Sequence, residues 1–200
     1  MIVARIISLC YFLLIVLFSN AQQVRKTISE SHNESDLAGN EYLQSNLKPI
    51  RENFKRINSI LKWTSVVTKE NNESTEGGET KFYYLNGLQK IIVRQFGETF
   101  QNLKEYYLLN GNLSFVLEKS YKYNRPIYYD STAMKENDDT TIFDMNKSEI
   151  VEIRSYFLNG KLIHQINNQD CGSPFYDEYL LGEQKRITSE FASIRKSRLQ

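Results

Sequence analysis

Cysteine is scarce in this 200-residue chain, which contains only Cys10 and Cys171. Cys10 lies inside an N-terminal apolar run, so a form cleaved after that run would keep Cys171 alone. A single cysteine cannot form an internal disulfide, even in an oxidising compartment. The fold therefore has to rest on its hydrophobic core.

The chain also lacks an excess of one charge. It has 25 Lys and Arg residues and 24 Asp and Glu residues, and Arg5 accounts for the formal net charge of +1. Proteins that bind nucleic acids usually carry a strong positive charge that neutralises phosphates. We therefore expect no nucleic-acid partner.

Spacings typical of metal and nucleotide sites are missing too. Gly77-Gly78 has neither a phosphate-loop lysine nor a Rossmann glycine pattern, and no zinc spacing is present. One acidic segment lacks the alternating oxygen ligands and the central glycine of an EF-hand loop. Its carboxylates are Glu136, Asp138, Asp139 and Asp144. We interpret this segment as a solvated loop and predict no metal and no cofactor.

His164 and Cys171 are the pair that invites a nucleophile hypothesis. A reactive thiolate needs a nearby base and usually a third group that orients the base. Counting from a predicted turn places His164 on the apolar face of a hairpin, which favours a buried histidine bonded to a neighbour. We predict no catalytic residue here.

The N-terminal residues indicate export. Arg5 precedes an apolar run over residues 6–18, and Ser19-Asn20-Ala21 places small residues where a signal peptidase reads them. We predict a signal peptide over residues 1–21. The apolar run is too short for a bilayer span, so we expect no transmembrane span after cleavage and a periplasmic or secreted protein.

The remaining chain is predicted to hold one domain. Residues 22–44 are polar and irregular, which predicts a flexible tether, and residues 45–200 form a single domain. Pro49 suits the first turn of a helix. Two helices are expected from apolar residues at helical spacing. These residues are Ile50, Phe54, Ile57 and Leu61 in the first helix, and Leu180, Ile187, Phe191 and Ile194 in the second, which begins near Pro174.

Three segments share one plan, in which aromatic and aliphatic residues lead into Asn-Gly. They are residues 82–87, 106–111 and 155–160. Asn-Gly tolerates the positive φ angles of a type I′ turn, whose twist matches the strands that it joins. Each copy therefore predicts a β-hairpin, and the polar segment 131–148 interrupts the series.

Counting outward from the turns predicts one apolar face. The expected opposite pairs are Leu108 with Leu113, Tyr106 with Phe115, Phe157 with Leu162, and Ile153 with Ile166. The other face would carry Glu105, Glu118, Arg154 and Lys161. An apolar sheet face needs a cover. The predicted fold class is α+β, an antiparallel β-meander of hairpins packed by an N-terminal and a C-terminal amphipathic helix.

Tyrosines and an arginine gather where the second hairpin ends. Tyrosine and arginine are enriched where proteins bind partners, because they combine contact area with directional hydrogen bonds. The candidate binding residues are Tyr121, Tyr123, Arg125, Tyr128 and Tyr129. Tyrosine is also an ordinary strand residue, so a purely structural role stays open.

Several blocks of sequence carry a family resemblance over residues 50–168. They are Ser-Thr-Glu-Gly-Gly-Glu at 74–79, Phe-Gly-Glu-Thr at 96–99, Tyr-Tyr at 106–107 with Asn-Gly at 110–111, Tyr-Asn-Arg-Pro-Ile-Tyr at 123–128, and residues 156–162. The chain resembles a family of uncharacterised exported bacterial proteins of unknown function. The resemblance implies a small periplasmic or surface domain and supplies no catalytic residue.

Together these observations predict a non-enzymatic binding domain in the cell envelope. Its partner would be a protein or another envelope component. The alternative is a hydrolase that acts on an envelope polymer through Glu76 and Glu79, since general acid/base chemistry needs paired carboxyl groups with separated pKa values. A purely structural envelope protein is a third hypothesis.

Overall fold

The computed structural model describes residues 41–71, 74–168 and 177–198. The chain divides into two units, residues 1–34 and 35–200, and all described residues belong to the second. The predicted signal peptide, most of the predicted tether and Cys171 lie outside the described residues. The described helices are α2 (Glu41–Asn58), α3 (Ser131–Glu136) and α4 (Asp177–Ser197), with a short 3₁₀ turn at Met145–Lys147.

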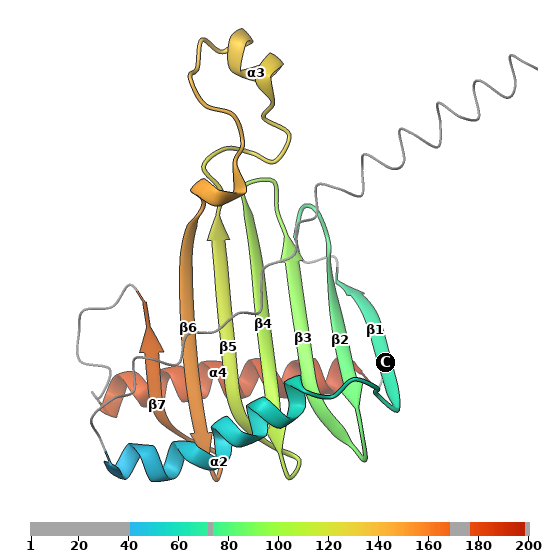
Figure 1. Ribbon diagram of the computed structural model, residues 1–200, viewed down its shortest axis with the longest axis vertical. Helices are drawn as coiled ribbons and strands as arrows, with labels where there is room; N and C mark the ends of the chain where they lie inside the picture. Colours follow the sequence, from blue (N-terminus) through green and yellow to red (C-terminus); the bar gives the residue numbers. More distant parts are fainter. Residues whose placement is uncertain (1–40, 72–73, 169–176, 199–200) are drawn as a thin grey trace, which may run out of the picture. The chain divides into compact units, whose positions relative to one another are not determined.

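Seven strands form one sheet in the order of the sequence, each antiparallel to its neighbour (Figure 1). The strands are β1 (Ser65–Asn71), β2 (Gly78–Tyr84), β3 (Leu88–Phe96), β4 (Phe100–Leu109), β5 (Asn112–Lys122), β6 (Glu149–Leu158) and β7 (Lys161–Asn167). With α2 and α4 packed on the sheet, the predicted fold class is confirmed: an α+β antiparallel meander.

The three Asn-Gly turns have the predicted backbone conformation. The φ angles of Asn86, Asn110 and Asn159 are 53°, 51° and 51°, and each following glycine also has a positive φ. A type I′ turn requires positive φ at both central residues, and asparagine and glycine adopt it most easily. The β4–β5 and β6–β7 loops have the two residues of such a turn, whereas the β2–β3 loop has three, residues 85–87. These turns close the β2–β3, β4–β5 and β6–β7 hairpins.

A β-bulge follows each turn and corrects the predicted register. Leu108 lies opposite Leu113 and Phe157 opposite Leu162, as expected, but Ser114 and Ile163 are then inserted as extra residues. Beyond the bulges, Phe115 lies opposite Tyr107 instead of Tyr106, and Ile166 lies opposite Arg154 instead of Ile153. One extra residue moves every later side chain to the other face.

Because of the bulges, both faces of the sheet are apolar where the helices cross it. The α4 face buries Phe82, Ile91, Val93, Tyr106, Leu108, Leu113, Val116, Phe157 and Leu162 against Ile187 and Phe191 of α4. The α2 face buries Tyr107, Phe115, Leu117 and Tyr156 against Leu47, Ile50 and Ile57 of α2. The prediction of a single apolar face is therefore wrong. Figure 1 shows both helices crossing the strands near the Asn-Gly turns.

The polar residues assigned to one face divide between the two faces for the same reason. Glu118 lies on the α4 face, where its carboxylate binds Arg186 of α4. Glu105 lies on the α2 face and is fully buried there. Glu118 was expected on the face opposite Leu108, so its position is a second correction. Glu105 does lie opposite the Leu108 face, as expected, but α2 covers that face and buries it.

Helix α2 also differs from its prediction. It begins at Glu41, and Pro49 lies inside it instead of in the first turn. Proline removes one helical hydrogen bond and crowds the preceding turn. Leu47 and Ile50, which flank Pro49, are almost fully buried against the sheet, and this packing holds the helix on both sides of the proline.

The predicted C-terminal helix is confirmed as α4, with Ile187 and Phe191 in the core. Among the described residues, neither α4 nor any other helix combines the length and the apolarity that a membrane span requires.

Candidate functional site

Most of the predicted site residues lie at one end of the sheet, away from the Asn-Gly turns. We call this the loop end; it comprises residues 74–77, 97–99 and 123–148 (Figure 1). Backbone hydrogen bonds join residues 97–99 to residues 123–148 and attach residues 74–77 to the end of β3. Tyr123 N donates to Thr99 O at 2.8 Å, Ile127 N to Glu98 O at 2.9 Å, and Glu76 N to Phe96 O at 3.2 Å. The loop end is therefore a connected structure.

Arg125 holds the long segment between β5 and β6 through Asp139. Its Nε and Nη2 donate to the two carboxylate oxygens of Asp139, each at 2.9 Å. This paired geometry is the strongest that arginine makes with a carboxylate. Tyr129 adds a hydrogen bond from its hydroxyl to Asp139 Oδ2 at 3.3 Å. The Arg125 hydrogen bonds, with that from Thr140 N, lower the pKa of Asp139 to about 2.

Asn124 and Tyr123 hold the same segment on its return to the sheet. Asn124 Nδ2 donates to Ile142 O at 2.9 Å, and its Oδ1 accepts from Asp144 N at 2.9 Å. The rings of Tyr123 and Phe143 meet edge to face at 5.2 Å between centroids. Tyr123, Arg125 and Tyr129 therefore act inside the loop end, where they fix the 131–148 segment.

Tyr128 has a different position from the other tyrosines. It is 65% exposed, and its hydroxyl donates to Glu76 Oε2 at 3.0 Å. Ile142, on the neighbouring segment, is exposed as well. Tyr128 and Ile142 are thus large apolar side chains that an ordered loop structure presents to solvent.

Tyr121 is separated from this group. It lies within β5 on the α2 face and pairs with Ile150 of β6. Burial, followed by the negative charge of Glu152, raises the pKa of the Tyr121 hydroxyl. The structure therefore groups four of the five predicted binding residues and leaves Tyr121 in the sheet.

Glu76 and Glu79 have unlike surroundings. Glu76 bonds to Tyr128 in the loop end, whereas Glu79 lies in β2 between Lys81 Nζ at 2.8 Å and Arg94 Nη1 at 3.2 Å. Burial acts to raise the pKa of Glu79, but the hydrogen bonds and charges of Lys81 and Arg94 outweigh it and leave that pKa lowered. A general acid needs a raised pKa, so this environment keeps Glu79 ionised.

His164 is buried, as expected of a core histidine, and stacks on Tyr156 with 5.8 Å between ring centroids. Burial, followed by the positive charge of Arg51, lowers its pKa. Because Cys171 lies outside the described residues, the structure does not test the pairing of the two. No cluster of three or more potential metal ligands occurs within residues 41–71, 74–168 and 177–198.

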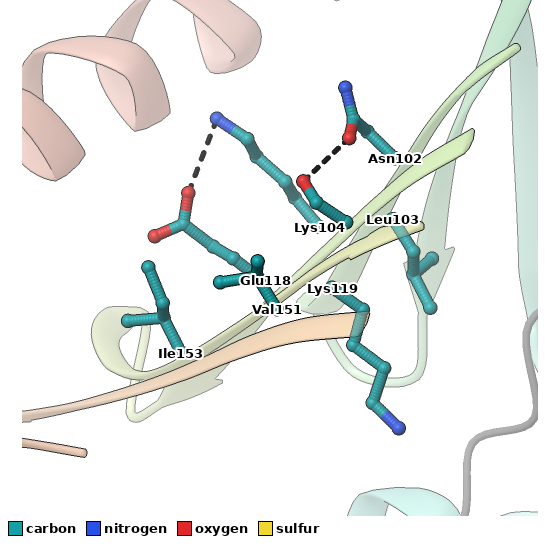
Figure 2. A pocket seen from close by; sticks show the side chains of 8 residues that line it. Asn102, Leu103, Lys104, Glu118, Lys119, Val151 and Ile153 are labelled. Carbon is teal, nitrogen blue, oxygen red and sulfur yellow. Dashed lines mark hydrogen bonds and ion pairs between the residues drawn. The ribbon is translucent and has the colours of Figure 1, made fainter. Parts of the chain in front are cut away.

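Sequence reasoning missed a hollow on the α4 face, formed by β4, β5 and β6. In Figure 2, Lys104 and Glu118 point toward one another across it, and Val151 and Ile153 stand beside them. Its volume is about 80 Å³, which suits a few water molecules and falls short of the ~300 Å³ typical of a small-molecule site. Lys104 pairs with Glu118 at 3.3 Å, and Ser120 bonds to Asn102 at 2.6 Å. Its polar groups thus already bind one another.

The same charged residues attach α4 to the sheet. Arg186 binds both carboxylate oxygens of Glu118, at 3.0 and 2.6 Å, and also binds Glu183 on its own helix. Lys104 reaches Glu190 of α4. Lys104 lies directly opposite Glu118 on the neighbouring strand. With the correct register, the sequence would have predicted this pair of opposite charges. We assign this hollow a structural role.

No protein-family model, no curated protein and no solved structure matches this chain. The resemblance to a family of exported bacterial proteins stays a prediction. The loop end is the candidate functional site, since it gathers the predicted residues into one ordered structure.

Proposed function

We propose that this chain is an exported, non-enzymatic binding module that contacts another cell-envelope component through the loop end. The supporting observation is Tyr128, which is 65% exposed on a loop structure fixed from within by Arg125 and Asp139. Exposed tyrosines on fixed backbones are favoured as binding anchors, since they supply contact area at a small entropic cost.

Preorganisation supports the same proposal. Ordering a flexible loop upon binding reduces affinity, because the lost conformational entropy opposes association. Here the side chains of Asn124, Arg125 and Tyr129 already bond to the 139–144 segment. The partner therefore meets Tyr128 and Ile142 in positions that need little further ordering.

The chemistry of the loop end indicates the kind of surface that it fits. Tyr128 and Ile142 offer exposed apolar area, and the carboxylate of Glu76 accepts the hydroxyl hydrogen of Tyr128. A partner with an apolar patch beside a hydrogen-bond donor would complement this arrangement. Nothing in the described residues favours the hydrolase alternative, since Glu79 is held ionised by Lys81 and Arg94.

Cross-linked pull-downs from envelope extract test this proposal with the full chain as bait. We expect one envelope component to be recovered by the native protein and lost with Tyr128→Ala. Leu181→Ala is the matched control, because Leu181 is an exposed apolar residue of α4. The proposal is wrong if both variants recover the component as well as the native protein, or if no bait recovers any.

A further inference from the structure

Strand β1 is an edge strand of the sheet that the described residues form. It is the first strand in the sheet and pairs only with β2. Val66 and Val67 are 43% and 39% exposed, and Ser65 and Thr68 are exposed too. Among the described residues, no backbone hydrogen bond crosses the outer side of residues 65–70.

The composition of β1 does little to block further pairing. Natural proteins protect edge strands with proline, bulges, charged side chains (lysine above all) or short length. In β1 the charged residues are Lys69 and Glu70, in the second half of the strand. β1 has seven residues, no proline and a regular register with β2, and its first four residues, Ser-Val-Val-Thr, carry no charge. Such an edge can accept an extended peptide by main-chain hydrogen bonding.

The last turn of α4 lies over the same edge and is basic. Lys69 of β1 donates to the carbonyl oxygen of Ser197, and Arg198 Nη1 donates to the hydroxyl of Tyr84 in β2 at 3.0 Å. Arg195 and Lys196 are exposed in that turn. Lys69 and Arg198 therefore place positive charge on the α4 side of the β1 edge, and Arg195, whose guanidinium lies over the Phe191 ring, and Lys196 add charge in the same turn of α4.

The two faces of the edge differ in chemistry. Val67 pairs with Phe82, which belongs to the α4 face, so Val67 and Lys69 point to the basic side. Val66 pairs with Tyr83, whose ring packs on Trp63 at 5.2 Å between centroids, so the other side is apolar and aromatic at Val66. Further along the strand, the same side carries the exposed residues Thr68 and Glu70. A complementary strand would alternate acidic and apolar residues, with the acidic ones below α4.

We propose that the outer edge of β1 binds an extended acidic segment of a partner protein as an eighth strand. The partner is acidic because the basic turn of α4 lies beside this edge. A second copy of this chain fits less well. Antiparallel pairing of two β1 strands would place both basic α4 ends on one face of the joint sheet, where like charges repel.

This proposal concerns a different surface from the loop end and stands independently of the proposed function. Its test is an NMR titration of the ¹⁵N-labelled full chain with a capped peptide as long as β1 in which valine and glutamate alternate. We expect the largest amide shifts in residues 65–71. A valine–lysine peptide of equal length should bind about tenfold more weakly, since charge complementarity selects the partner.

Two double variants distinguish the effect of the charges in the last turn of α4 from the effect of the net charge of the protein. Arg195→Glu/Lys196→Glu should weaken binding of the valine–glutamate peptide about tenfold, because each substitution replaces an attractive exposed charge with a repulsive one. Lys55→Glu/Lys185→Glu changes the net charge equally at exposed helix positions and should leave binding within about twofold. The proposal would be overturned if both double variants lost affinity equally.

A change in the peptide tests main-chain pairing without any risk to the fold. Methylation of alternate backbone nitrogens along one edge removes donors while the side chains stay in place. If the peptide binds as a strand, the version methylated on the pairing edge should lose binding, and the version methylated on the opposite edge should keep it. Equal binding by both versions, shifts centred outside residues 65–71, or no binding at about 1 mM peptide would contradict the proposal.

Discussion

Lys90 and Glu105 form an ion pair on the α2 face of the sheet, with side chains 6% and 0% exposed and 3.1 Å between Nζ and Oε2. Lys90 also donates to Asn58 Oδ1 at 3.1 Å, and Tyr107 donates its hydroxyl hydrogen to Glu105. Removing two charges from water costs several kcal/mol for each ion, and such neighbours offset much of that cost. The pair stabilises the fold only while both members are present.

The first prediction concerns this pair. Lys90→Met should reduce the free energy of unfolding by about 3–5 kcal/mol, because it leaves the Glu105 carboxylate buried without its cation. Lys90→Met/Glu105→Leu should recover most of that loss, since an apolar pair replaces an ionic one. Urea denaturation of both variants measures the difference. A double variant less stable than the single variant would show that the ion pair itself stabilises the fold.

The second prediction concerns the pH dependence of the loop end. Asp139 has a pKa of about 2 in the folded chain and an ordinary value of 3.8, so the ionised form is favoured by folding. Its stabilising contribution is present above pH 3.8 and disappears as the pH falls from 3.8 to 2. The amide of Thr140, which donates to Asp139 Oδ1, should titrate with a midpoint near 2 in NMR spectra.

Arg125→Lys provides the control, because it keeps the charge and removes the paired hydrogen bonds. The midpoint should then move upward, toward 3.8. A midpoint unchanged by this substitution would mean that Arg125 does not hold Asp139.

At the scale of the element, glycine has opposite roles in the hairpins and in α4. Gly111 has a φ of +80° in a type I′ turn, whereas Gly182 lies inside α4. No neighbouring atom lies within 4 Å of an added Cβ at either position. The effect of an alanine substitution on stability therefore depends on the backbone conformation at each position and not on steric contacts.

The third prediction compares these two glycines. Gly111→Ala should destabilise the fold by about 1 kcal/mol, because a Cβ disfavours positive φ. Gly182→Ala should stabilise it by about 0.5–1 kcal/mol, because alanine is the better helix former. Thermal unfolding of both variants gives the signs. A stabilising Gly111→Ala would be incompatible with the left-handed turn.

The fourth prediction ranks the attachments of α4. Phe191 is nearly buried and stacks on Tyr106 at 5.7 Å, so Phe191→Ala should cost about 3–5 kcal/mol. Arg186, with a side chain 39% exposed, makes ion pairs that solvent screens, so Arg186→Met should cost about 1 kcal/mol or less. Denaturant unfolding decides the order. A larger loss for Arg186→Met would make the charged network the main attachment.

The elements show where sequence patterns suffice and where they fail. Asn-Gly at residues 110–111 and 159–160 defines two hairpins from local conformational preference alone. The bulges at Ser114 and Ile163 have no comparable local signal, and each changes the face of every later residue. Continuous apolar runs such as residues 106–109 were the available indication that both faces are covered.

At the scale of the whole molecule, four of the five predicted binding residues lie together in the loop end, and their binding role stays a prediction. Their clustering was predictable, because residues 121–130 are adjacent in the chain. Their roles were not, since Arg125 is held by Asp139, 14 residues away, and Tyr128 by Glu76, 52 residues away. Only the folded chain separates Tyr128, which faces solvent, from Arg125 and Tyr129, which bind within the loop.

Site-specific photo-cross-linking in cells tests the binding function of the loop end most directly. A benzophenone amino acid replaces Tyr128, Ile142 or, as the control on α4, Leu181 in the full chain. We predict that the same envelope component cross-links at positions 128 and 142 and not at 181. Cross-links at all three positions, or none at 128 and 142, would contradict a binding role for the loop end.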